Sequence, residues 1–412
     1  MTAPSPAMPA GTYPHLDLHP RPDLHQRLSE LRGHGPVVRV ALHNRVPAWL
    51  VSGAADVESA LTDPRLSSND RWLHPGGGGA GRSTVKVSLM GLDGPEHMRL
   101  RRILARPFTP RSVDGLRPRV QALTDELVDR LKRQPAADLV QDLALPLPLH
   151  VICDVLGVPQ TNRDDVHRLA QRLLDPSTDP RVREQLRGRL GNLIDVQDTP
   201  ADGATFTSTL LRDSALTARE TVDASVLLLI AGYETTAKLI GSILLWLLER
   251  PARYRALTRD PSLIPAVVDE LLRLQGPVTL GVTRYSTTDV TISGTLIPAG
   301  QRVLLSLGAA DRDPRRWPHP DSYDLARSPG GRSLAFGHGP HFCLGAHLAR
   351  LEAQTVLAVL ARRIPRLALA EPARSLGRQA GIFHGPALLP VWVDPVPRHA
   401  RSRREARSPG KV

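Results

Sequence analysis

Cysteine is scarce in this chain of 412 residues, in which only Cys153 and Cys343 occur. Two cysteines so far apart cannot form a disulfide framework or a cysteine-rich zinc site, and they indicate a reducing compartment. The first 23 residues contain several prolines and lack the basic start and long apolar run of a signal peptide. We therefore predict a cytoplasmic protein that is not secreted.

Lysine is also scarce, because it occupies only positions 86, 132, 238 and 411 and arginine supplies all other basic residues. The formal net charge is +12, and much of it comes from the tail, residues 397–412. Such a tail raises the alternative of a nucleic-acid-binding arm. No aromatic side chain that could stack on bases interleaves the tail's arginines, so we predict a disordered tail and no nucleic-acid partner.

Long apolar runs are few, and the most extended one lies in residues 217–248. Thr217 and Glu220 have the spacing of a capping box, and the apolar sequence that follows predicts one long helix. A membrane span is the alternative interpretation. Glu234 and Lys238 interrupt the apolar run, so we predict a buried helix in a soluble core and no membrane.

The remaining pattern indicates a mainly α protein with small β-sheets. Helical periodicity recurs through residues 95–156, residues 283–307 alternate as short strands, and a strand pair is expected near residues 388–393. Residues 75–81, PGGGGAG, and residues 198–208 lack periodicity and predict loops. A phosphate-binding loop is the alternative for the glycine-rich segment, but no Gly-Lys-Ser/Thr follows it.

A glycine-punctuated segment, residues 336–345, ends in a cysteine just before a predicted helix: Phe-Gly-His-Gly-Pro-His-Phe-Cys-Leu-Gly. Gly337 and Gly339 allow a tight turn and a close approach to a flat ligand, and Gly345 removes a side chain that would collide with it. At a helix N-terminus, free backbone N–H groups favour the thiolate of Cys343, which is the form that binds a metal. For an isolated cysteine, a small buried apolar residue would be the alternative interpretation.

The same segment matches the haem-binding signature Phe-Gly-x-Gly-x-His-x-Cys-x-Gly at every fixed position, and the chain thereby resembles the soluble bacterial cytochrome P450 family over roughly residues 49–393. The resemblance implies the cytochrome P450 fold (α+β), with haem b (iron protoporphyrin IX) between the long central helix and the helix after the cysteine loop. It implies that Cys343 is the ligand of the haem iron, with Phe336, His341 and Gly345 in the haem-binding segment.

The stretch Ala231-Gly-Tyr-Glu234-Thr235-Thr236 in the long helix is similar to the oxygen-activating stretch of the family. The resemblance implies that Glu234 and Thr235 are catalytic, as the acid and alcohol that position water and deliver protons to bound dioxygen. It also implies that Gly232 opens space above the iron. The alternative is a polar kink in a buried helix, where Thr235 only bonds back to the carbonyl four residues earlier.

Basic residues in two other segments match family residues that bind the haem propionates. In Asp93-Gly-Pro-Glu-His97-Met-Arg-Leu-Arg101, His97 and Arg101 are spaced to lie on one helical face, and Arg284 follows in Val-Thr-Arg-Tyr. Buried carboxylates require such cations. For each arginine the alternative is a solvated surface charge.

Glu270 and Arg273 resemble the family's Glu-x-x-Arg pair, and their spacing puts both charges on one helical face. The resemblance implies a buried structural lock behind the haem. The family usually completes this lock with a downstream arginine. Arg316 and Arg327 flank the relevant stretch, but Ser322 stands where many relatives carry arginine, so the third member stays unassigned.

Four segments correspond by position to those that wall the family's substrate pocket: residues 70–91, 228–235, 279–282 and 382–384. Their side chains suggest an apolar cavity with a few polar groups. The pocket residues that we expect are Leu228, Ala231, Gly232, Thr279, Val282 and Phe383.

The resemblance implies a haem-thiolate monooxygenase that activates O2 with two externally supplied electrons to hydroxylate or epoxidise a hydrophobic small molecule of specialised metabolism. A ferredoxin and an NAD(P)H-dependent ferredoxin reductase would supply the electrons. Arg99, Arg102 and Arg106 would steer this acidic partner, and a merely solvated helix face is the alternative. Oxidative C–C or C–N coupling and an inert haem-fold scaffold are the alternatives. Residues 1–25 are expected to be a flexible proline-rich N-terminus and residues 26–396 the single catalytic domain, before the disordered arginine-rich tail.

Overall fold

The computed structural model confirms a mainly helical protein with small sheets. It describes residues 13–16, 23–42, 45–73, 89–174, 178–194, 216–327, 333–376 and 383–394. The predicted loops at 75–81 and 198–208, the tail at 397–412, Ile382 and most of the N-terminal segment lie outside the described residues.

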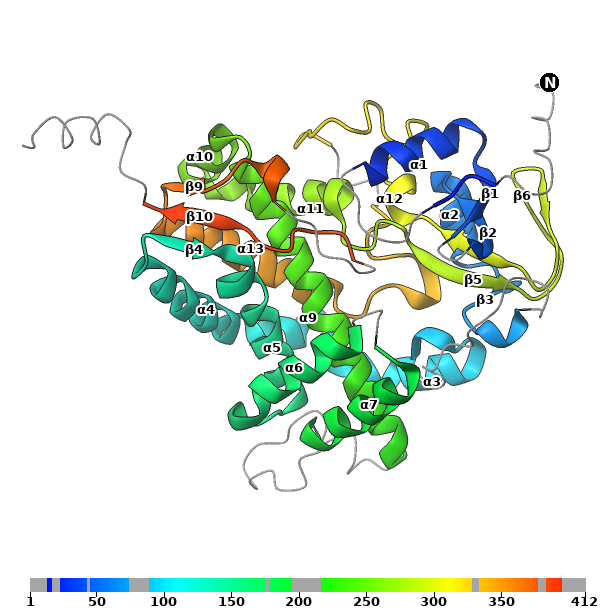
Figure 1. Cartoon of the computed structure of the whole chain (residues 1–412), viewed down its shortest axis with the longest axis horizontal. Coiled ribbons are helices and arrows are strands. Elements are labelled where there is room, and N and C mark those ends of the chain that lie inside the picture. Colours follow the sequence, from blue (N-terminus) through cyan, green and yellow to red (C-terminus); the bar gives the residue numbers. More distant parts are fainter. Residues whose placement is uncertain are drawn as a thin grey trace, which may run out of the picture.

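A five-stranded sheet forms one end of the molecule (Figure 1), and its strand order is β1-β2-β8-β5-β3. Two smaller sheets have the orders β4-β10-β9 and β6-β7. The strands are β1 (Val37–Ala41), β2 (Pro47–Val51), β3 (Leu66–Ser67), β4 (Ala136–Asp138), β5 (Val282–Ser286), β6 (Val290–Ile292), β7 (Thr295–Ile297), β8 (Arg302–Leu305), β9 (Leu367–Leu369) and β10 (Pro390–Val393).

Helices make up most of the other end of the molecule, and a few of them also lie beside the five-stranded sheet. They are α1 (Leu24–Gly33), α2 (Ala54–Ala60), α3 (Gly94–Leu104), α4 (Pro110–Lys132), α5 (Pro146–Leu156), α6 (Arg163–Leu174), α7 (Pro180–Ile194), α9 (Ala218–Leu248), α10 (Pro251–Arg259), α11 (Ile264–Gln275), α12 (Leu307–Ala310) and α13 (Ala346–Arg363).

Part of the segment predicted to be a flexible N-terminus is fixed in place. His15 forms a β-bridge to Ala41, and the backbone N–H of the buried Leu16 donates to the Ala41 carbonyl at 2.8 Å. Helix α1 then begins at Leu24. The division into residues 1–25, 26–396 and 397–412 otherwise stays a prediction.

The long helix α9 crosses the molecule as predicted from its apolar sequence (Figure 1). The capping box is confirmed, because the Glu220 N–H donates to Thr217 Oγ1 at 3.2 Å and the Thr217 N–H donates to Glu220 Oε2 at 2.8 Å. Within the described residues one helix, residues 219–248, is long and apolar enough to span a membrane, and 72% of its most apolar window is buried inside the protein. That burial is typical of a core helix.

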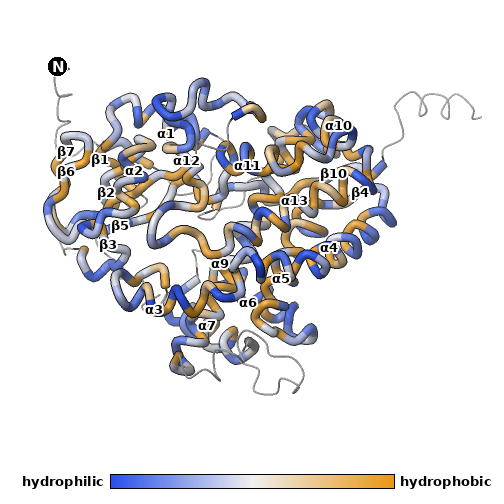
Figure 2. The backbone as a smooth tube through the Cα atoms, turned by 180° about the vertical axis from the view of Figure 1, so that it is seen from behind, coloured by the Kyte–Doolittle hydropathy of each residue, from blue (hydrophilic) through white to orange (hydrophobic). Residues whose placement is uncertain are grey.

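Helix α13 packs beside α9 and also against α4, α10 and α11. Hydrophobic segments gather along α9 and α13 in the middle of the chain's fold (Figure 2). Four leucine and valine residues on one side of α13 are buried: Leu348, Leu351, Val356 and Leu360. The segment that carries Cys343 therefore leads directly into a helix anchored in the core.

Candidate haem site

The loop before α13 is shaped by two glycines with positive φ, Gly337 at +72° and Gly339 at +69°. A Cβ at Gly339 would lie 2.5 Å from Thr62 Cγ2, so a side chain there would also collide with the end of α2. The Cys343 N–H donates to the Phe336 carbonyl at 2.9 Å and closes the loop. This backbone geometry explains why the segment needs glycine at both positions.

Cys343 is accessible to solvent although protein surrounds it. Burial raises the pKa of its thiol, while the Gly345 N–H and the positive charges of Arg101 and Arg350 act in the opposite direction. A Cβ at Gly345 would meet no protein atom within 4 Å. No protein atom therefore explains the glycine at position 345. A bound non-protein group beside Cys343 would explain it, because a side chain at this position would then collide with that group.

Three basic residues near this loop form no ion pair within 4 Å among the described residues, although the charge of Asp93 acts on two of them, His97 and Arg284. His97 is 1% exposed, and both of its ring nitrogens are buried without a hydrogen-bond partner. Arg284 is 5% exposed and donates only to the Thr283 carbonyl, at 3.0 Å. Arg101 donates to the Phe342 carbonyl at 2.5 Å. Buried donors such as those of His97 and Arg284 require an anionic or polar partner, and the propionates of a haem would meet that need.

Burial lowers the pKa of His97 to about 4, and the charges of His341 and Arg101 lower it further. Burial also lowers the pKa of Arg284 and of Arg101. In each case the protein alone disfavours the charged form, and an anion bound between these side chains would reverse that effect. The residues present therefore fit a haem carboxylate.

His341 is held differently from the other predicted propionate partners. Its Nε2 lies 3.2 Å from Ser68 Oγ and 3.5 Å from Asp93 Oδ1, and its ring stacks on His97 with centroids 4.1 Å apart. Ser67 Oγ also donates to Asp93, at 2.5 Å. One ring nitrogen of His341 is thus already engaged by the protein, which leaves Nδ1 for a propionate.

The predicted catalytic residues lie on α9 in a short stretch that solvent reaches. Ala231 is exposed and Thr235 partly exposed, although the helix around them is mostly buried. Thr235 Oγ1 donates to the Ala231 carbonyl at 2.7 Å, and Thr236 Oγ1 donates to the Gly232 carbonyl at 2.9 Å. The back-bonding considered as an alternative therefore occurs, and the Thr235 oxygen can still accept a hydrogen bond from water.

Glu234 lies next to these threonines and is 9% exposed. Burial raises the pKa of its carboxyl, and the positive charge of Lys238 lowers it. Glu234 Oε1 and Lys238 Nζ are 3.9 Å apart, one turn along α9. The lysine is a partner of the acid that the sequence interpretation passed over, although its i, i+4 spacing was a visible signal.

Gly232 has a packing contact that the sequence interpretation did not consider, and its role above the iron stays a prediction. A Cβ at Gly232 would lie 3.1 Å from Cγ1 and 3.2 Å from Cδ1 of Ile152 on α5. The glycine therefore permits the close packing of α9 on α5, and the side of α9 that solvent reaches is that of Ala231.

The structural lock forms around Glu270 and Arg273, which are 6% and 2% exposed. Arg273 Nε donates to Glu270 Oε2 at 2.8 Å, and its Nη2 donates to Oε1 at 2.7 Å. Arg327 completes the lock, because its Nε donates to Glu270 Oε1 at 3.2 Å. The member that sequence left unassigned is therefore Arg327.

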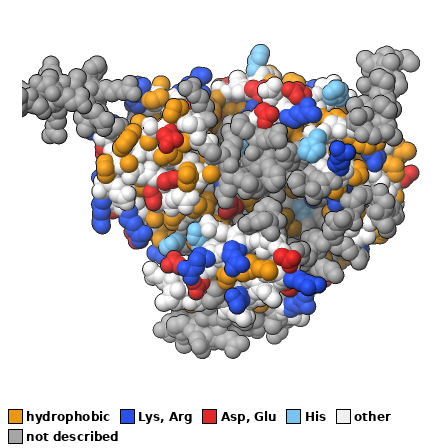
Figure 3. Space-filling model, in the orientation of Figure 1, with side chains coloured by type: hydrophobic (Ala, Val, Ile, Leu, Met, Phe, Trp, Pro, Cys, Tyr) orange, Lys and Arg blue, Asp and Glu red, His pale blue; other side chains and the backbone are white. Residues whose placement is uncertain are grey.

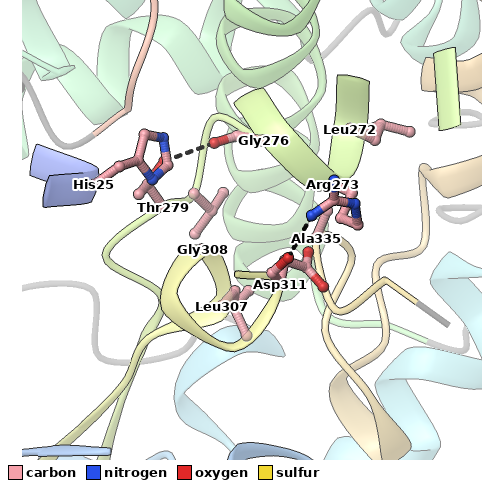
Figure 4. A pocket seen from close by; sticks show the side chains of 10 residues that line it. His25, Leu272, Arg273, Gly276, Thr279, Leu307, Gly308, Asp311 and Ala335 are labelled. Atoms are coloured by element: carbon pink, nitrogen blue, oxygen red, sulfur yellow. Dashed lines mark hydrogen bonds between the residues drawn. The ribbon is translucent and has the colours of Figure 1, made fainter. Parts of the chain in front are cut away.

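The lock also reaches the beginning of the cysteine segment. Arg273 Nη1 donates to the Asp311 carbonyl at 2.8 Å, as Figure 4 shows. The Asp311 carboxylate accepts the Leu334 N–H at 2.8 Å and the Ser333 hydroxyl at 2.7 Å. This chain of contacts fixes the backbone just before Phe336.

The pocket residues divide into two groups. Val282 and Phe383 are partly exposed, and Leu228 is 7% exposed on the same helix as Ala231. Thr279 instead is 2% exposed, donates to the Gly276 carbonyl at 2.8 Å, and lines a small cavity with Gly308 and His25 (Figure 4). Thr279 therefore faces this small cavity, and the place of all four residues in a substrate pocket stays a prediction.

Basic side chains are scattered among acidic and apolar ones on the face shown in Figure 3. Arg99 forms an ion pair with Glu220 at the beginning of α9, which reduces its use for steering a partner. Arg102 and Arg106 are exposed.

The fold and an accessible cysteine surrounded by unpaired basic groups define a haem-thiolate protein. The sequence profile described as Cytochrome P450 matches residues 182–364. The chain is 39% identical over 380 residues to the Vitamin D(3) 25-hydroxylase of Pseudonocardia autotrophica, covering 90% of this chain and 94% of that one. It is 38% identical over 400 residues to the Mycinamicin IV hydroxylase/epoxidase of Micromonospora griseorubida, covering 92% and 98%.

The solved structure of the cytochrome P450 enzyme CxnD, described as acting in C–S bond formation in chuangxinmycin biosynthesis, has a TM-score of 0.83 to this chain. The two are 31% identical, and the match covers 93% of this chain and 98% of that one. The chain belongs to the cytochrome P450 family. It is a monooxygenase with haem b as its cofactor, and it uses O2, a hydrophobic substrate and redox partners.

Proposed function

We propose that this enzyme hydroxylates or epoxidises a hydrophobic small molecule of specialised metabolism in the cytoplasm, with electrons from a separate ferredoxin and ferredoxin reductase. The names of two relatives support the reaction type, since one is a hydroxylase and the other a hydroxylase/epoxidase. The partly exposed Val282 and Phe383 and the apolar Leu228 support a hydrophobic substrate. The exposed Arg102 and Arg106 offer positive charge to an acidic electron donor.

The observation that carries this proposal is the accessible thiol of Cys343 beside basic groups that form no ion pair among the described residues. Cys343 would bind the haem iron, and His97, Arg101 and Arg284 would bind the propionates, with His341 contributing its remaining ring nitrogen. When bound, the haem supplies activation of O2, which thiolate donation favours. Phe336 and Gly345 would leave room for the haem and line its edge.

Two residues on α9 would handle protons. Glu234 would take a proton from solvent, and Thr235 would hold a water molecule through its free lone pairs. Ala231, exposed one turn before Thr235, leaves space for a substrate beside them. Binding of an apolar substrate would exclude bulk water from this stretch, so that protons arrive through the two side chains.

A second candidate function is oxidative bond formation between two parts of a substrate. The structural match to CxnD, whose description names C–S bond formation, favours this candidate. The same site would serve both reactions, because the difference lies in how the substrate is held. Identification of the product, with or without an added oxygen atom, separates the two.

The proposed function is tested by the carbon monoxide difference spectrum of the reduced protein, in wild type, Cys343→Ala and Cys153→Ala. Cys153 is a matched control because it is buried in α5, where burial raises the pKa of its thiol to about 12. We expect the long-wavelength Soret band of thiolate ligation in wild type and Cys153→Ala, and its loss in Cys343→Ala. A short-wavelength band in folded wild-type protein would reject the proposal.

A further inference from the structure

A buried ion pair lies on α9 beside the proposed proton pathway. The side chains of Lys238 and Glu234 are 4% and 12% exposed, and Nζ lies 3.9 Å from Oε1. Both residues stand on one face of the helix at i, i+4 spacing. A buried lysine is rare in proteins, and it costs stability unless it serves a partner. The partner here is the acid to which we assign proton delivery.

The lysine is also fixed from its other side by the segment that leads into β10. Lys238 Nζ donates to the Pro386 carbonyl at 3.1 Å. A Cβ at Gly385 would lie 2.9 Å from Lys238 Cδ and 3.2 Å from its Cα, so the backbone of this segment rests directly on the lysine stem. Phe383, a proposed pocket residue, is two positions earlier in the same segment. Lys238 therefore joins the acid of α9 to a wall of the pocket.

The two charges support each other against burial. Burial raises the pKa of Glu234 and lowers that of Lys238, and each residue opposes the shift of the other. Among the described residues, Lys238 is the one charged group that acts on Glu234. Without the lysine, nothing in the described part of the chain would offset the cost of a buried carboxylate.

We propose that Lys238 is a positioning residue for Glu234, which keeps the carboxylate ionised at neutral pH and oriented toward the segment 384–386. This inference rests on the proposed function only in assigning a use to Glu234. In this arrangement Glu234 is ionised before turnover begins. It therefore acts first as a proton acceptor, because an ionised carboxylate must take up a proton before it can deliver one. It also makes the charge of Glu234 sensitive to the position of the segment that carries Phe383.

The experiment is infrared spectroscopy of the full-length holoenzyme at neutral pH, which detects the C=O stretching band of a protonated carboxyl group. The variants are Lys238→Met, Lys238→Gln and Glu234→Gln, together with each lysine variant combined with Glu234→Gln. Lys238→Gln keeps a donor for the Pro386 carbonyl and removes only the charge, so it covers the case in which Lys238→Met does not fold. Lys132→Met, on the exposed side of α4, is the matched control.

Wild type and Lys132→Met should already show the band of protonated Asp311, whose pKa burial raises to about 7. We expect both lysine variants to gain a further carboxyl band in the difference spectrum against wild type, and we expect Glu234→Gln to remove that added band. A merely structural lysine would not produce a band that depends on Glu234. If neither lysine variant gains the band, or if the band persists without Glu234, the inference is overturned.

A second measurement separates this inference from the proposed function. NADPH consumption is followed with a surrogate ferredoxin and ferredoxin reductase, and Glu234→Gln should slow it by roughly tenfold or more if Glu234 delivers protons. In that background, adding Lys238→Gln should change the rate no further, because the lysine acts through the acid. An unchanged rate in Glu234→Gln would remove Glu234 from the proposed function, while the infrared result still decides the role of Lys238.

Discussion

Arg327 Nε donates to Glu270 Oε1 at 3.2 Å, on the carboxylate that Arg273 already holds through two hydrogen bonds from the same helix. Glu270 is thus shared by an arginine of α11 and an arginine that follows it by 57 residues. The second arginine also donates to the carbonyls of Pro318 and His319 at 2.9 Å. Arg327 therefore fastens the loop after α12 to α11.

Replacement of Arg327 by methionine should destabilise the protein by roughly 2–4 kcal/mol, because it leaves a buried carboxylate with one cation in place of two. Urea unfolding of the holoenzyme measures the change. Arg117→Met is the control, since Arg117 and its partner Asp114 are 59% and 69% exposed and such pairs contribute at most about 1 kcal/mol. Equal losses in the two variants would contradict the assignment of Arg327 to the lock.

Asp311 should make stability depend on pH. Burial raises the pKa of its carboxyl from 3.8 to about 7 in the folded protein. In the unfolded chain this carboxyl loses its proton above about pH 4, whereas in the folded protein it does so only near pH 7. The free energy of unfolding therefore falls as the pH rises between these two values. Asp311→Asn removes this dependence on pH. The free energy of unfolding of the variant relative to wild type should therefore be higher at pH 8 than at pH 4, by an amount on the order of 1–3 kcal/mol.

Thermal or urea unfolding at several pH values checks this result for Asp311. Asp114→Asn is the matched control, because Asp114 is exposed and should give a difference that changes little with pH. An Asp311→Asn variant that is less stable than wild type at every pH would show that the hydrogen bonds to Leu334 and Ser333 matter more than the buried charge.

Loss of the ring nitrogens of His97 should weaken haem retention. His97→Phe keeps a ring against His341, 4.1 Å away in the wild type, and removes the donor that has no partner in the described protein. A hydrogen bond to a charged group contributes about 1.5–3 kcal/mol, so haem should dissociate roughly tenfold faster or more. Transfer of haem to an excess of a scavenging apoprotein measures the rate.

The exposed His34 serves as the control for this experiment, and His34→Phe should keep the wild-type rate. Circular dichroism of both variants establishes that the fold is retained. A wild-type rate in His97→Phe would mean that Arg101 and Arg284 hold the propionates without this histidine.

Features that depend on neighbouring residues could be predicted from the sequence. The glycines of the cysteine loop, the capping box at Thr217 and the long helix that follows it are encoded locally, and the structure has them where the pattern indicated. Pro251 follows this helix and is the first residue of α10, because proline is tolerated in the first turn of a helix.

Features that depend on distant contacts could not be predicted. Arg327 meets Glu270 across 57 residues, and the Lys238 amine meets Pro386 across 148 residues. No local spacing indicates such pairs, since they form only when the loops have taken their places. The direction of a side chain has the same limit, as Thr279 shows by packing its Cγ2 beside Gly308.

Gly232 offers a direct test of whether packing or space near the iron requires a glycine in α9. A methyl group at this position would lie 3.1 Å from Ile152 Cγ1, so Gly232→Ala should cost about 1–3 kcal/mol through overpacking, offset in part by alanine's better helix propensity. Ile152→Ala alone should cost about 2–5 kcal/mol, because it leaves a cavity in the core. The combined variant should be destabilised by less than the sum of the two single losses, since the new methyl fills part of that cavity.

Urea unfolding measures the stability of all three variants, and the carbon monoxide spectrum reports on the haem side of α9. An additive loss of stability together with weakened carbon monoxide binding in Gly232→Ala would instead place the methyl group over the iron.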